Sequence, residues 1–469
     1  MEKRNKIYNQ KGVNIFQRRY VQRKVAIQNQ NRKSEELLYS SSIEKKSNIS
    51  SLVQKNLSLN LYINNQLIDT SKYANTFSQL DFNVPSVLLD NLSSRGFESM
   101  TPIQRLSIPS SLSLIDVVGC AQTGSGKTIS YLFPIISLLL SNSDDIYEIN
   151  KKERKSFPLA VILLPTRELA IQTYEEALKL VYNTNIIVTV VYGGEAYNEQ
   201  IYNLRQGCDI LIGTPGRLLN YIEKDIADLS EVKYLVIDEA DDMLDMGFIP
   251  DVDRIISEMP ETNQRMNMLF SATFPRKIVD QVISVYIKEN YAYITPGEGE
   301  FTDDNTPNMN IEQRFYYIDS KDIFDKVDAL HQLLQIIRGK TIIFVNTKRD
   351  VEGLAKVMNE KNYNVGKIHG DMDQEKRREV MAMFSKGEIP LLIATDVASR
   401  GLDIPQIDFV INFDMPSNIE DYVHRIGRTG RCGIKGRSLT LLAPYDQGMF
   451  YSIRDMLKRS NQKIPDFLS

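Results

Sequence analysis

Short apolar runs alternate with segments of helical spacing along most of the chain, from Phe77 to about Leu442. Short apolar runs that alternate with helices are typical of strands buried in a parallel sheet with helices on both faces. A first set of such runs lies at 159–164, 186–191, 210–212, 234–237 and 266–270. A second set lies at 341–345, 365–368, 391–394, 409–412 and 439–442. The two sets predict two α/β domains in tandem.

The segment between the two sets, GEGEFTDDNTPNMN at 297–310, is polar, acidic and punctuated by Gly and Pro, which is typical of a flexible linker. We therefore expect one domain at 77–296 and a second at 311–446, followed by a short tail at 447–469. Residues 1–76 are rich in Ser, Asn, Gln, Lys and Arg and lack sustained periodicity. This composition predicts a mostly disordered extension.

Size and composition exclude several classes of protein. The chain of 469 residues is 42% hydrophobic, as expected of a globular protein with room for two or three domains. Its longest apolar run is interrupted by Pro134 and is too short to cross a bilayer, and its start is too polar for a secretory signal. With three distant cysteines and three histidines, a disulfide framework or a zinc site is not expected.

The charge is unevenly distributed along the chain. Residues 1–50 have 12 Lys or Arg against 4 Asp or Glu, a net charge of +8, so the formal net charge of −4 leaves the remaining residues at −12. A body of that charge is not a bulk polyanion binder, and any contact with nucleic acid there must come from local groups. The basic arm is either a solvated tail or a nonspecific attractor of RNA phosphates.

Residues 121–128, AQTGSGKT, follow a short apolar run and precede a long apolar stretch. Gly124 and Gly126 allow successive backbone N–H groups to converge on one point, and the following helix adds its positive N-terminal end. In such a phosphate loop Lys127 reaches the β- and γ-phosphates, and the Thr128 hydroxyl binds Mg²⁺. The usual pattern begins with Gly, whereas this chain has Ala121.

Residues 235–241, LVIDEAD, place two acids at the end of a buried strand, about 110 residues after the phosphate loop. In a phosphate-loop enzyme the carboxylate of Asp238 holds the water shell of Mg²⁺. The neighbouring Glu239 orients and deprotonates the attacking water. The two motifs together predict a nucleoside triphosphatase.

Six further strings follow in order along the chain: PTRELA at 165–170, TPGR at 214–217, DEAD at 238–241, SAT at 271–273, TDVASRGLD at 395–403 and HRIGRTGR at 424–431. Together they resemble the motif set of a DEAD-box RNA helicase. They occur in that family's order, and the similarity extends from about Phe77 to Leu442. The resemblance implies two tandem RecA-like domains and an RNA-stimulated ATPase that unwinds short duplexes locally, with ATP and Mg²⁺ as cofactors.

The resemblance also implies an ATP site. GFESMTPIQ at 96–104 matches the family's adenine-reading element, in which the Gln104 amide can both donate to and accept from the base. Phe77 is provisionally assigned as the aromatic upstream of this element, although by the family spacing it lies about two residues early and the alternative, Phe82, about three residues late. The phosphate-loop residues implied to bind nucleotide are Ala121, Gln122, Thr123, Gly124, Ser125, Gly126, Lys127 and Thr128.

Further residues implied by the family complete the catalytic machinery. Arg428 and Arg431 match its arginine fingers, and Asp403 is expected to contact the ribose. Ser271 and Thr273 are expected to couple the nucleotide site to the RNA site. His424 is expected to link the nucleotide site to the rest of the second domain.

The implied RNA groove is formed by backbone amides, hydroxyls and a few guanidinium groups, which suit phosphates and 2′-hydroxyls rather than base edges. Binding is therefore expected to be indifferent to sequence and to favour RNA over DNA. The implied groove residues are Pro165, Thr166, Arg167, Gly193, Gly194, Thr214, Pro215, Gly216, Arg217, Thr347, Gln374, Arg377, Thr395 and Arg400.

Longer strings, such as DEADDMLDMGF at 238–248, are most similar to the branch containing Vasa and its translation-initiation relatives, although the chain lacks long Arg/Gly-rich tails. Translation initiation is therefore the expected process, and ribosome assembly or splicing is the alternative. An ATP-gated RNA clamp with little turnover is a third possibility, and a translocating DNA helicase is a distant fourth.

A monomer is expected, in the cytoplasm and also in the nucleus. YINNQLI at Tyr62–Ile68 fits the Tyr-x4-Leu-Φ pattern of proteins that dock on the cap-binding translation factor.

Overall fold

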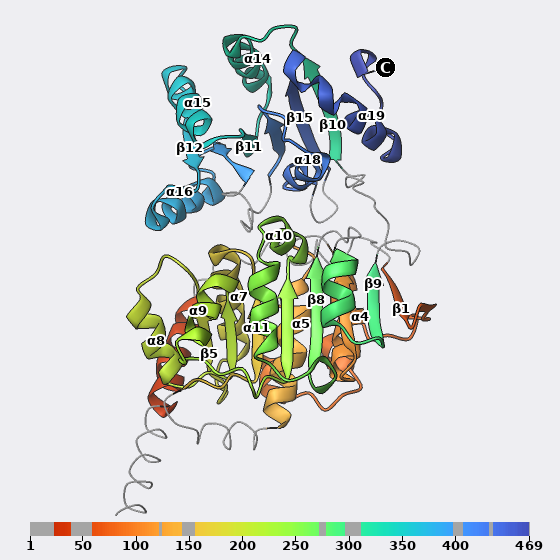
Figure 1. Cartoon of the computed structure of the whole chain (residues 1–469), viewed down its shortest axis with the longest axis vertical. Coiled ribbons are helices and arrows are strands. Elements are labelled where there is room, and N and C mark those ends of the chain that lie inside the picture. Colours follow the sequence, from red (N-terminus) through yellow and green to blue (C-terminus); the bar gives the residue numbers. More distant parts are fainter. Residues whose placement is uncertain are drawn as a thin grey trace, which may run out of the picture. The chain divides into compact units, whose positions relative to one another are not determined.

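The computed structural model of the chain describes residues 23–38, 59–121, 124–142, 155–271, 278–295, 311–396, 407–430 and 435–468. It divides into two compact units, Met1–Thr302 and Asp303–Ser469, and the division falls inside the predicted linker. Each unit is built on its own sheet (Figure 1). Of the helices in the described ranges, none combines the length and the apolar character that crossing a membrane requires.

The first unit contains a nine-stranded sheet in the order β2-β1-β9-β3-β8-β7-β4-β6-β5. Neighbouring strands are parallel from β9 to β5, whereas β1 is antiparallel to both β9 and β2. In sequence order the strands are β1 Asn60–Ile63, β2 Gln66–Leu67, β3 Asp116–Cys120, β4 Ala160–Leu163, β5 Val188–Val191, β6 Ile210–Gly213, β7 Tyr234–Asp238, β8 Met266–Ser271 and β9 Tyr291–Thr295. The five strands expected for this domain are confirmed.

Helices cover both faces of this sheet because successive strand residues point to opposite sides. Ala160 and Ile162 of β4 belong to one buried cluster, and Val161 and Leu163 belong to the other. The first cluster is packed by α3 Ser86–Ser93, α4 Pro102–Leu112, α5 Lys127–Ser141 and α7 Arg167–Leu180. The second is packed by α8 Tyr197–Arg205, α9 Pro215–Glu223, α10 Ala240–Asp245, α11 Ile249–Ser257 and α13 Ser284–Tyr286.

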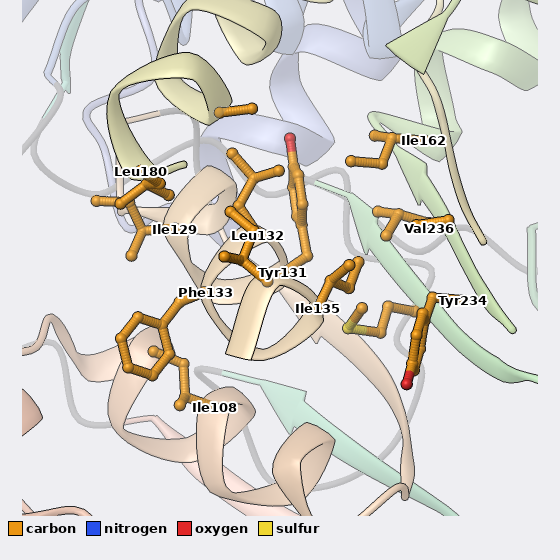
Figure 2. Close-up of a cluster of buried hydrophobic side chains, with 14 of the residues drawn as sticks. Ile108, Ile129, Tyr131, Leu132, Phe133, Ile135, Ile162, Leu180, Tyr234 and Val236 are labelled. Carbon is orange, nitrogen blue, oxygen red and sulfur yellow. The ribbon is translucent and has the colours of Figure 1, made fainter. Parts of the chain in front are cut away.

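Helix α5 is the centre of the first cluster. It contributes fully buried side chains such as Leu132 and Ile135, which pack with Ile162 and Val236 of the strands (Figure 2). Burial of each such side chain stabilises the fold by about 1.5–3 kcal/mol. Because α5 is anchored so firmly, the phosphate loop at its amino end has a rigid support.

The second unit contains a six-stranded, fully parallel sheet in the order β10-β15-β14-β11-β13-β12. Its strands are β10 Ile311–Tyr317, β11 Thr341–Phe344, β12 Val365–Ile368, β13 Leu391–Ala394, β14 Phe409–Asn412 and β15 Gly436–Leu442, which confirms the five predicted strands. One face is covered by α14 Ile323–Ile336 and α15 Lys348–Glu360, and the other by α16 Gln374–Lys386, α18 Ile419–Ile426 and α19 Phe450–Arg459.

Two parts of the predicted disordered extension 1–76 are instead ordered and belong to the first unit. Strand β1 pairs with β9 and extends the sheet at one edge, so the domain boundary expected at residue 77 is too late. Residues 23–38 form a helix beside β5, the strand at the other edge (Figure 1, red). The helix is polar and the strand has only four residues, so neither shows a sustained periodic apolar signal.

The helix at 23–38 is held by polar side chains. The Gln30 amide donates to Ile186 O at 2.8 Å and accepts from Val188 N–H at 2.9 Å, so it pairs with the backbone of the edge strand. Arg23 donates to both carboxylate oxygens of Asp209, at 2.6 and 3.3 Å. Ser34 donates to the carbonyl of Leu178 at 2.9 Å. An exposed strand edge is a template for unwanted pairing, and this helix covers it.

The predicted tail at 447–469 is also part of a domain. Ile453, Met456 and Leu457 of α19 are buried in the core of the second unit. Gln462 donates to Ile311 O at 2.7 Å and accepts from Gln313 N–H at 2.9 Å, which ties this segment to β10. The second domain therefore extends beyond the expected boundary at residue 446.

We predict that Gln30→Ala weakens the edge of the first sheet. The substitution leaves the buried N–H of Val188 and C=O of Ile186 without their partner, which costs about 1–3 kcal/mol. Denaturant unfolding should show that loss, and hydrogen exchange of the Val188 amide should accelerate.

Gln28→Ala is the matched control, because Gln28 is an exposed glutamine of the same helix. It should leave both measurements unchanged. Equal effects of the two variants would show that the Gln30 amide does not secure β5.

Candidate active site and nucleic-acid interface

The candidate nucleotide residues follow three adjacent strands of the first sheet, β3, β8 and β7. Cys120 of β3 lies opposite Ser271 of β8, and Phe270 of β8 lies opposite Asp238 of β7. The carboxyl ends of these parallel strands therefore meet at one edge of the sheet. This edge brings the phosphate loop, the DEAD motif and Ser271 together, although the sequence separates them by up to about 150 residues.

The phosphate loop has the backbone that its glycines predict. Gly126 has φ +100° and immediately precedes α5. A Cβ atom at this position would lie 2.4 Å from Gln104 Nε2 and 2.9 Å from Thr101 Oγ1, so a larger residue cannot fit. Within the described residues, the buried Ser125 Oγ has no hydrogen-bond partner. A glycine cradle with an unsatisfied hydroxyl at a helix amino end suits a phosphate group.

Gln104 is buried against the phosphate loop. Its side chain donates to Gly126 O at 3.1 Å and accepts from Thr101 N–H at 2.9 Å. An amide has two donor hydrogens and several acceptor lone pairs, so it keeps capacity for a base. In this conformation Gln104 joins α4 to the phosphate loop, a structural role that the sequence did not predict.

Lys127 faces the two acids of the DEAD motif in a buried cluster. Its Nζ lies 2.9 Å from Glu239 Oε2 and 4.0 Å from Asp238 Oδ1, and all three side chains are less than a tenth exposed. The contact with Glu239 is a buried ion pair. Burial alone would lower the pKa of Lys127, but the nearby carboxylates outweigh it and raise that pKa. The lysine is therefore charged and available to phosphates.

The two acids have different environments. Burial raises the pKa of Asp238 to about 6, against the opposing effect of the Lys127 charge. Glu239 has a left-handed backbone, with φ 50° and ψ 57°, which is uncommon for a residue with a side chain. Such conformations cost about 1–3 kcal/mol and concentrate at functional sites. A buried ammonium beside paired carboxylates fits a triphosphate with Mg²⁺.

Ser271 connects the phosphate loop to the DEAD motif. Its hydroxyl accepts from Asp241 N–H at 3.2 Å, and its carbonyl accepts from Ala121 N–H at 3.0 Å. The predicted coupling role of Ser271 therefore has a structural basis on the nucleotide side. Thr273, Gln122 and Thr123 lie outside the described residues.

The predicted RNA residues of the first unit follow the other half of the same sheet edge. Strands β4, β6 and β5 are adjacent, and Gly213 lies opposite both Leu163 and Val191. The loops that begin with Pro165, Gly193 and Thr214 therefore emerge side by side. Gly193, Gly194 and Gly216 are exposed, so their backbone amides are accessible.

Individual residues of this half have defined partners. Thr166 caps the amino end of α7, where its hydroxyl accepts from Leu169 N–H at 3.4 Å. Arg167 pairs with Glu195 at 3.2 Å and lies against Gly194, where a Cβ would be 2.4 Å from its Nη1. Arg217 lies over the Tyr197 ring at 5.6 Å. The two arginines are thus oriented by neighbours, and a bound phosphate would compete with Glu195 for Arg167.

The second unit places its candidates at the corresponding edge. Thr347 follows β11 and begins α15, where its hydroxyl accepts from Asp350 N–H at 3.2 Å. Thr395 follows β13 and is buried. Arg377 lies on α16, whose first residue is Gln374. Arg400, Asp403 and Arg431 lie outside the described residues.

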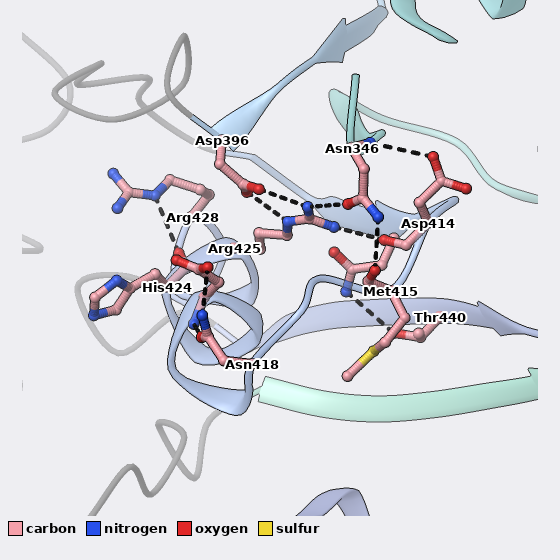
Figure 3. A network of polar contacts seen from close by, with 11 residues as sticks. Asn346, Asp396, Asp414, Met415, Asn418, His424, Arg425, Arg428 and Thr440 are labelled. Carbon is pink, nitrogen blue, oxygen red and sulfur yellow. Dashed lines mark hydrogen bonds and ion pairs between the residues drawn. The ribbon is translucent and has the colours of Figure 1, made fainter. Parts of the chain in front are cut away.

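Arg425, which sequence reasoning did not select, is the centre of this edge (Figure 3). Its buried guanidinium donates to both carboxylate oxygens of Asp396 at 2.5 and 2.6 Å, to Asp414 O at 2.6 Å and to Asn346 Oδ1 at 2.8 Å. Those residues follow β13, β14 and β11. Arg425 therefore fixes α18, which carries His424 and ends two residues before Arg428. Arg428 Nε donates to His424 O at 3.2 Å. Arg425 is the second residue of the string HRIGRTGR, and this string is the sequence signal from which it could have been selected.

The structure does not support Phe77 as a nucleotide contact. Its ring is only 4% exposed and packs against Phe133 of α5, with centroids 5.2 Å apart. A base could reach it only if it left the core. Phe82, the other aromatic near this spacing, is 37% exposed.

Comparisons with known proteins agree with this geometry. The family model described as DEAD/DEAH box helicase matches residues 101–282, and the helicase conserved C-terminal domain matches residues 325–433. A DEAD box protein from the hyperthermophile Methanococcus jannaschii is 36% identical, with 84% of this chain and 99% of that chain covered and a TM-score of 0.47.

Two other solved structures show further similarity. S. cerevisiae Dbp5 bound to RNA and ADP BeF3 is 27% identical, with coverage of 83% and 95% and a TM-score of 0.68. The RNA helicase Prp28 from Chaetomium thermophilum bound to ADP is 32% identical, with coverage of 88% and 94% and a TM-score of 0.43. The likeness to Dbp5 supports the fold, and the two family models, which together match more than half of the chain, show membership of the helicase family.

We predict that Asp238 makes the stability of the nucleotide-free protein depend on pH. Its pKa is raised on folding from 3.8 to about 6, so its stabilising contribution is complete below pH 4 and is lost as the pH rises through 6. That loss is about 2–3 kcal/mol. Asp238→Asn should therefore gain about this much over the wild type between pH 4 and pH 7.5 in denaturant unfolding. A difference between the two proteins that stays constant with pH would contradict the assignment.

Proposed function

Because the chain belongs to the DEAD-box family of ATP-hydrolysing RNA helicases, we propose that it couples RNA-stimulated ATP hydrolysis to local, sequence-independent opening of short RNA duplexes or remodelling of RNA–protein complexes. The observation that supports this function is the shared edge of the first sheet. The nucleotide residues follow β3, β8 and β7, and the RNA residues follow β4, β6 and β5. A structural change in the nucleotide half of the edge can therefore reach the RNA half through adjacent strands.

In the nucleotide half, the chain's own residues bind and orient the triphosphate. Lys127 exchanges its ion pair with Glu239 for the β- and γ-phosphates, which releases the Glu239 carboxylate to accept a proton from water. When bound, Mg²⁺ would neutralise phosphate charge, held by the Thr128 hydroxyl and, through water, by Asp238. Ser271 keeps the DEAD motif and the phosphate loop in fixed register.

In the RNA half, the groups available are backbone amides, capping hydroxyls and oriented arginines. Such groups bind phosphates and 2′-hydroxyls, which are the same for every sequence. The exposed Gly193 and Gly194 allow the RNA backbone to approach closely. This chemistry supports binding that favours RNA over DNA and ignores base identity.

The second unit supplies the groups that complete catalysis. Binding of ATP and RNA together brings the two units into a closed state, in which Arg428 and Arg431 reach the phosphates and the RNA strand is bent away from its partner. Arginine fingers contribute about 10³–10⁵ in rate, or roughly 4–7 kcal/mol of barrier. Without RNA the enzyme therefore holds ATP and hydrolyses it slowly, and phosphate loss reopens it.

We predict that Glu239→Gln abolishes turnover without weakening nucleotide binding. Loss of a general base costs about 10²–10⁴ in rate. Lys127 loses an ion-pair partner, so the affinity for ADP should be equal or higher. RNA-stimulated ATPase activity, unwinding of short duplexes in gels and binding of a fluorescent ADP measure the three quantities.

Glu261→Gln, at an exposed glutamate in the first unit, is the control and should leave all three unchanged. Arg431→Ala should remove the RNA stimulation while ADP binding persists. Strand separation that needs no ATP, or full activity of Glu239→Gln, would refute the proposed function.

For the cellular process, we propose translation initiation, supported by the strings shared with the Vasa and translation-initiation branch. Splicing is the alternative supported by a relative, since yeast Prp28 is described as a splicing factor, and ribosome assembly is another. An RNA clamp with little turnover is disfavoured by the intact Glu239, Ser271, Thr273, Arg428 and Arg431. A cytoplasmic monomer with access to the nucleus fits the proposed process.

For a protein partner, we propose that Tyr62–Ile68 docks on the cap-binding translation factor. The segment forms the β1–β2 hairpin, in which Tyr62 lies opposite Leu67 and Leu67 is 62% exposed. A different DEAD-box protein, Dbp5, has been solved with a protein partner, Gle1.

We predict that crosslinking of the tagged chain to cellular RNA recovers messenger RNA near its 5′ end. Recovery of spliceosomal or ribosomal precursor RNA would instead move the enzyme to splicing or ribosome assembly. In the same cells, Tyr62→Ala should reduce capture of the cap-binding factor, and unchanged capture would eliminate the docking role.

A further inference from the structure

Tyr131 is a buried polar group at the nucleotide site that the mechanism above does not use. It lies on α5 three residues after Thr128, so the two side chains share one side of the helix. Its ring stands among the apolar side chains of the first cluster (Figure 2) and packs on Phe270, with centroids 5.6 Å apart. Its hydroxyl is completely buried, so each of its hydrogen bonds must come from the protein.

The hydroxyl of Tyr131 donates to Asp238 Oδ2 at 3.0 Å. Asp238 Oδ1 accepts from the N–H of Glu239 at 2.9 Å, so both carboxylate oxygens are held by donors. The Thr173 hydroxyl lies 3.4 Å from the phenol oxygen. Because an ionised Asp238 can only accept, the phenol proton points to it and Thr173 must be the donor to Tyr131.

Burial raises the pKa of Tyr131, and the nearby Thr128 hydroxyl on α5 partly offsets that rise. A hydroxyl that gives a lone pair to a cation still has its proton to donate, and the Tyr131 oxygen can accept it. Tyr131 therefore binds Asp238 and lies next to Thr128, the two side chains assigned to Mg²⁺. Outer groups of this kind orient the ligands of a metal and are often as important to its affinity as the ligands themselves.

We propose that Tyr131 is a positioning residue that fixes the Thr128 hydroxyl and the Asp238 carboxylate in the orientation that receives the hydrated Mg²⁺ of the bound nucleotide. This inference rests on the proposed function, because it assigns a role within the same ATP site. It requires no new chemistry at Tyr131, which neither touches the nucleotide nor exchanges a proton with it. Phenylalanine would preserve the packing on Phe270 and remove only the oxygen.

The test is the affinity of purified full-length Tyr131→Phe for a fluorescent ADP, measured in Mg²⁺ and in EDTA at pH 7.5. The Mg²⁺-dependent gain in affinity should fall by about tenfold, the lower end of the effect of such outer groups. The affinity in EDTA should stay within about twofold of the wild type, because Lys127 and the loop amides are unchanged. In ATPase assays the Mg²⁺ concentration for half-maximal rate should rise by a similar factor.

Tyr422→Phe is the matched control. Tyr422 is also a fully buried tyrosine, and its hydroxyl donates to Gln313 Oε1 at 3.0 Å in the second unit. Its loss should lower the unfolding temperature and leave the Mg²⁺ dependence unchanged. Thr173→Val, which retains the phenol–Asp238 bond, should reduce the Mg²⁺-dependent gain less than Tyr131→Phe does.

An unchanged Mg²⁺-dependent gain in Tyr131→Phe would overturn the proposal, as would an equal loss of affinity in Mg²⁺ and in EDTA. The latter would show that the phenol supports the fold of the site in general. Failure of the proposed function would give a different result: the ATPase activity of the wild-type protein would not respond to RNA.

Discussion

The parallel register of the first sheet is the constraint on which the site depends. Parallel neighbours place all their carboxyl ends at one edge, so chain segments that are distant in sequence meet there. The ladder aligns Cys120 with Ser271 and Leu163 with Gly213. A slip of one residue in any of these pairs would turn the strand's side chains to the opposite face and move its loop. Packing of Val117, Ile162 and Val236 against α5 therefore secures the chemistry as well as the fold.

Two ion pairs lie at this edge of the sheet: Lys127 with Glu239, and Arg167 with Glu195. Each joins a cation that phosphate needs to a carboxylate that the phosphate must displace. Burial of a charge is costly unless the charge is paired, so these carboxylates stabilise the two cations. Arg425 differs, because each of its three guanidinium nitrogens donates to a partner within the second unit.

The sequence predicted two sets of five strands, the two α/β domains and the strings of the site, because periodic apolar runs and glycine turns are local signals. It did not predict the link from Gln104 to Gly126 or that from Ser271 to Asp241, since these contacts join residues 22 and 30 positions apart through tertiary packing. Phe77 was predicted to contact the base but packs in the core, because an isolated aromatic suits a core and a base equally well. The helix at 23–38 was missed because Arg23, Gln30 and Ser34 hold it by hydrogen bonds rather than by an apolar stripe.

The segments before Phe77 close both edges of the first sheet, and their origin in the chain affects how the unit is made. Strand β1 emerges from the ribosome more than 200 residues before β9, which is the longer of its two neighbouring strands. Gln30 likewise waits for Ile186 and Val188. Contacts between such distant residues form late, because a long loop must close first. During synthesis the β5 edge can be covered once residue 188 is translated, whereas the β9 edge stays open until residue 295 is translated, and that interval is when a nascent chain most needs protection from its neighbours.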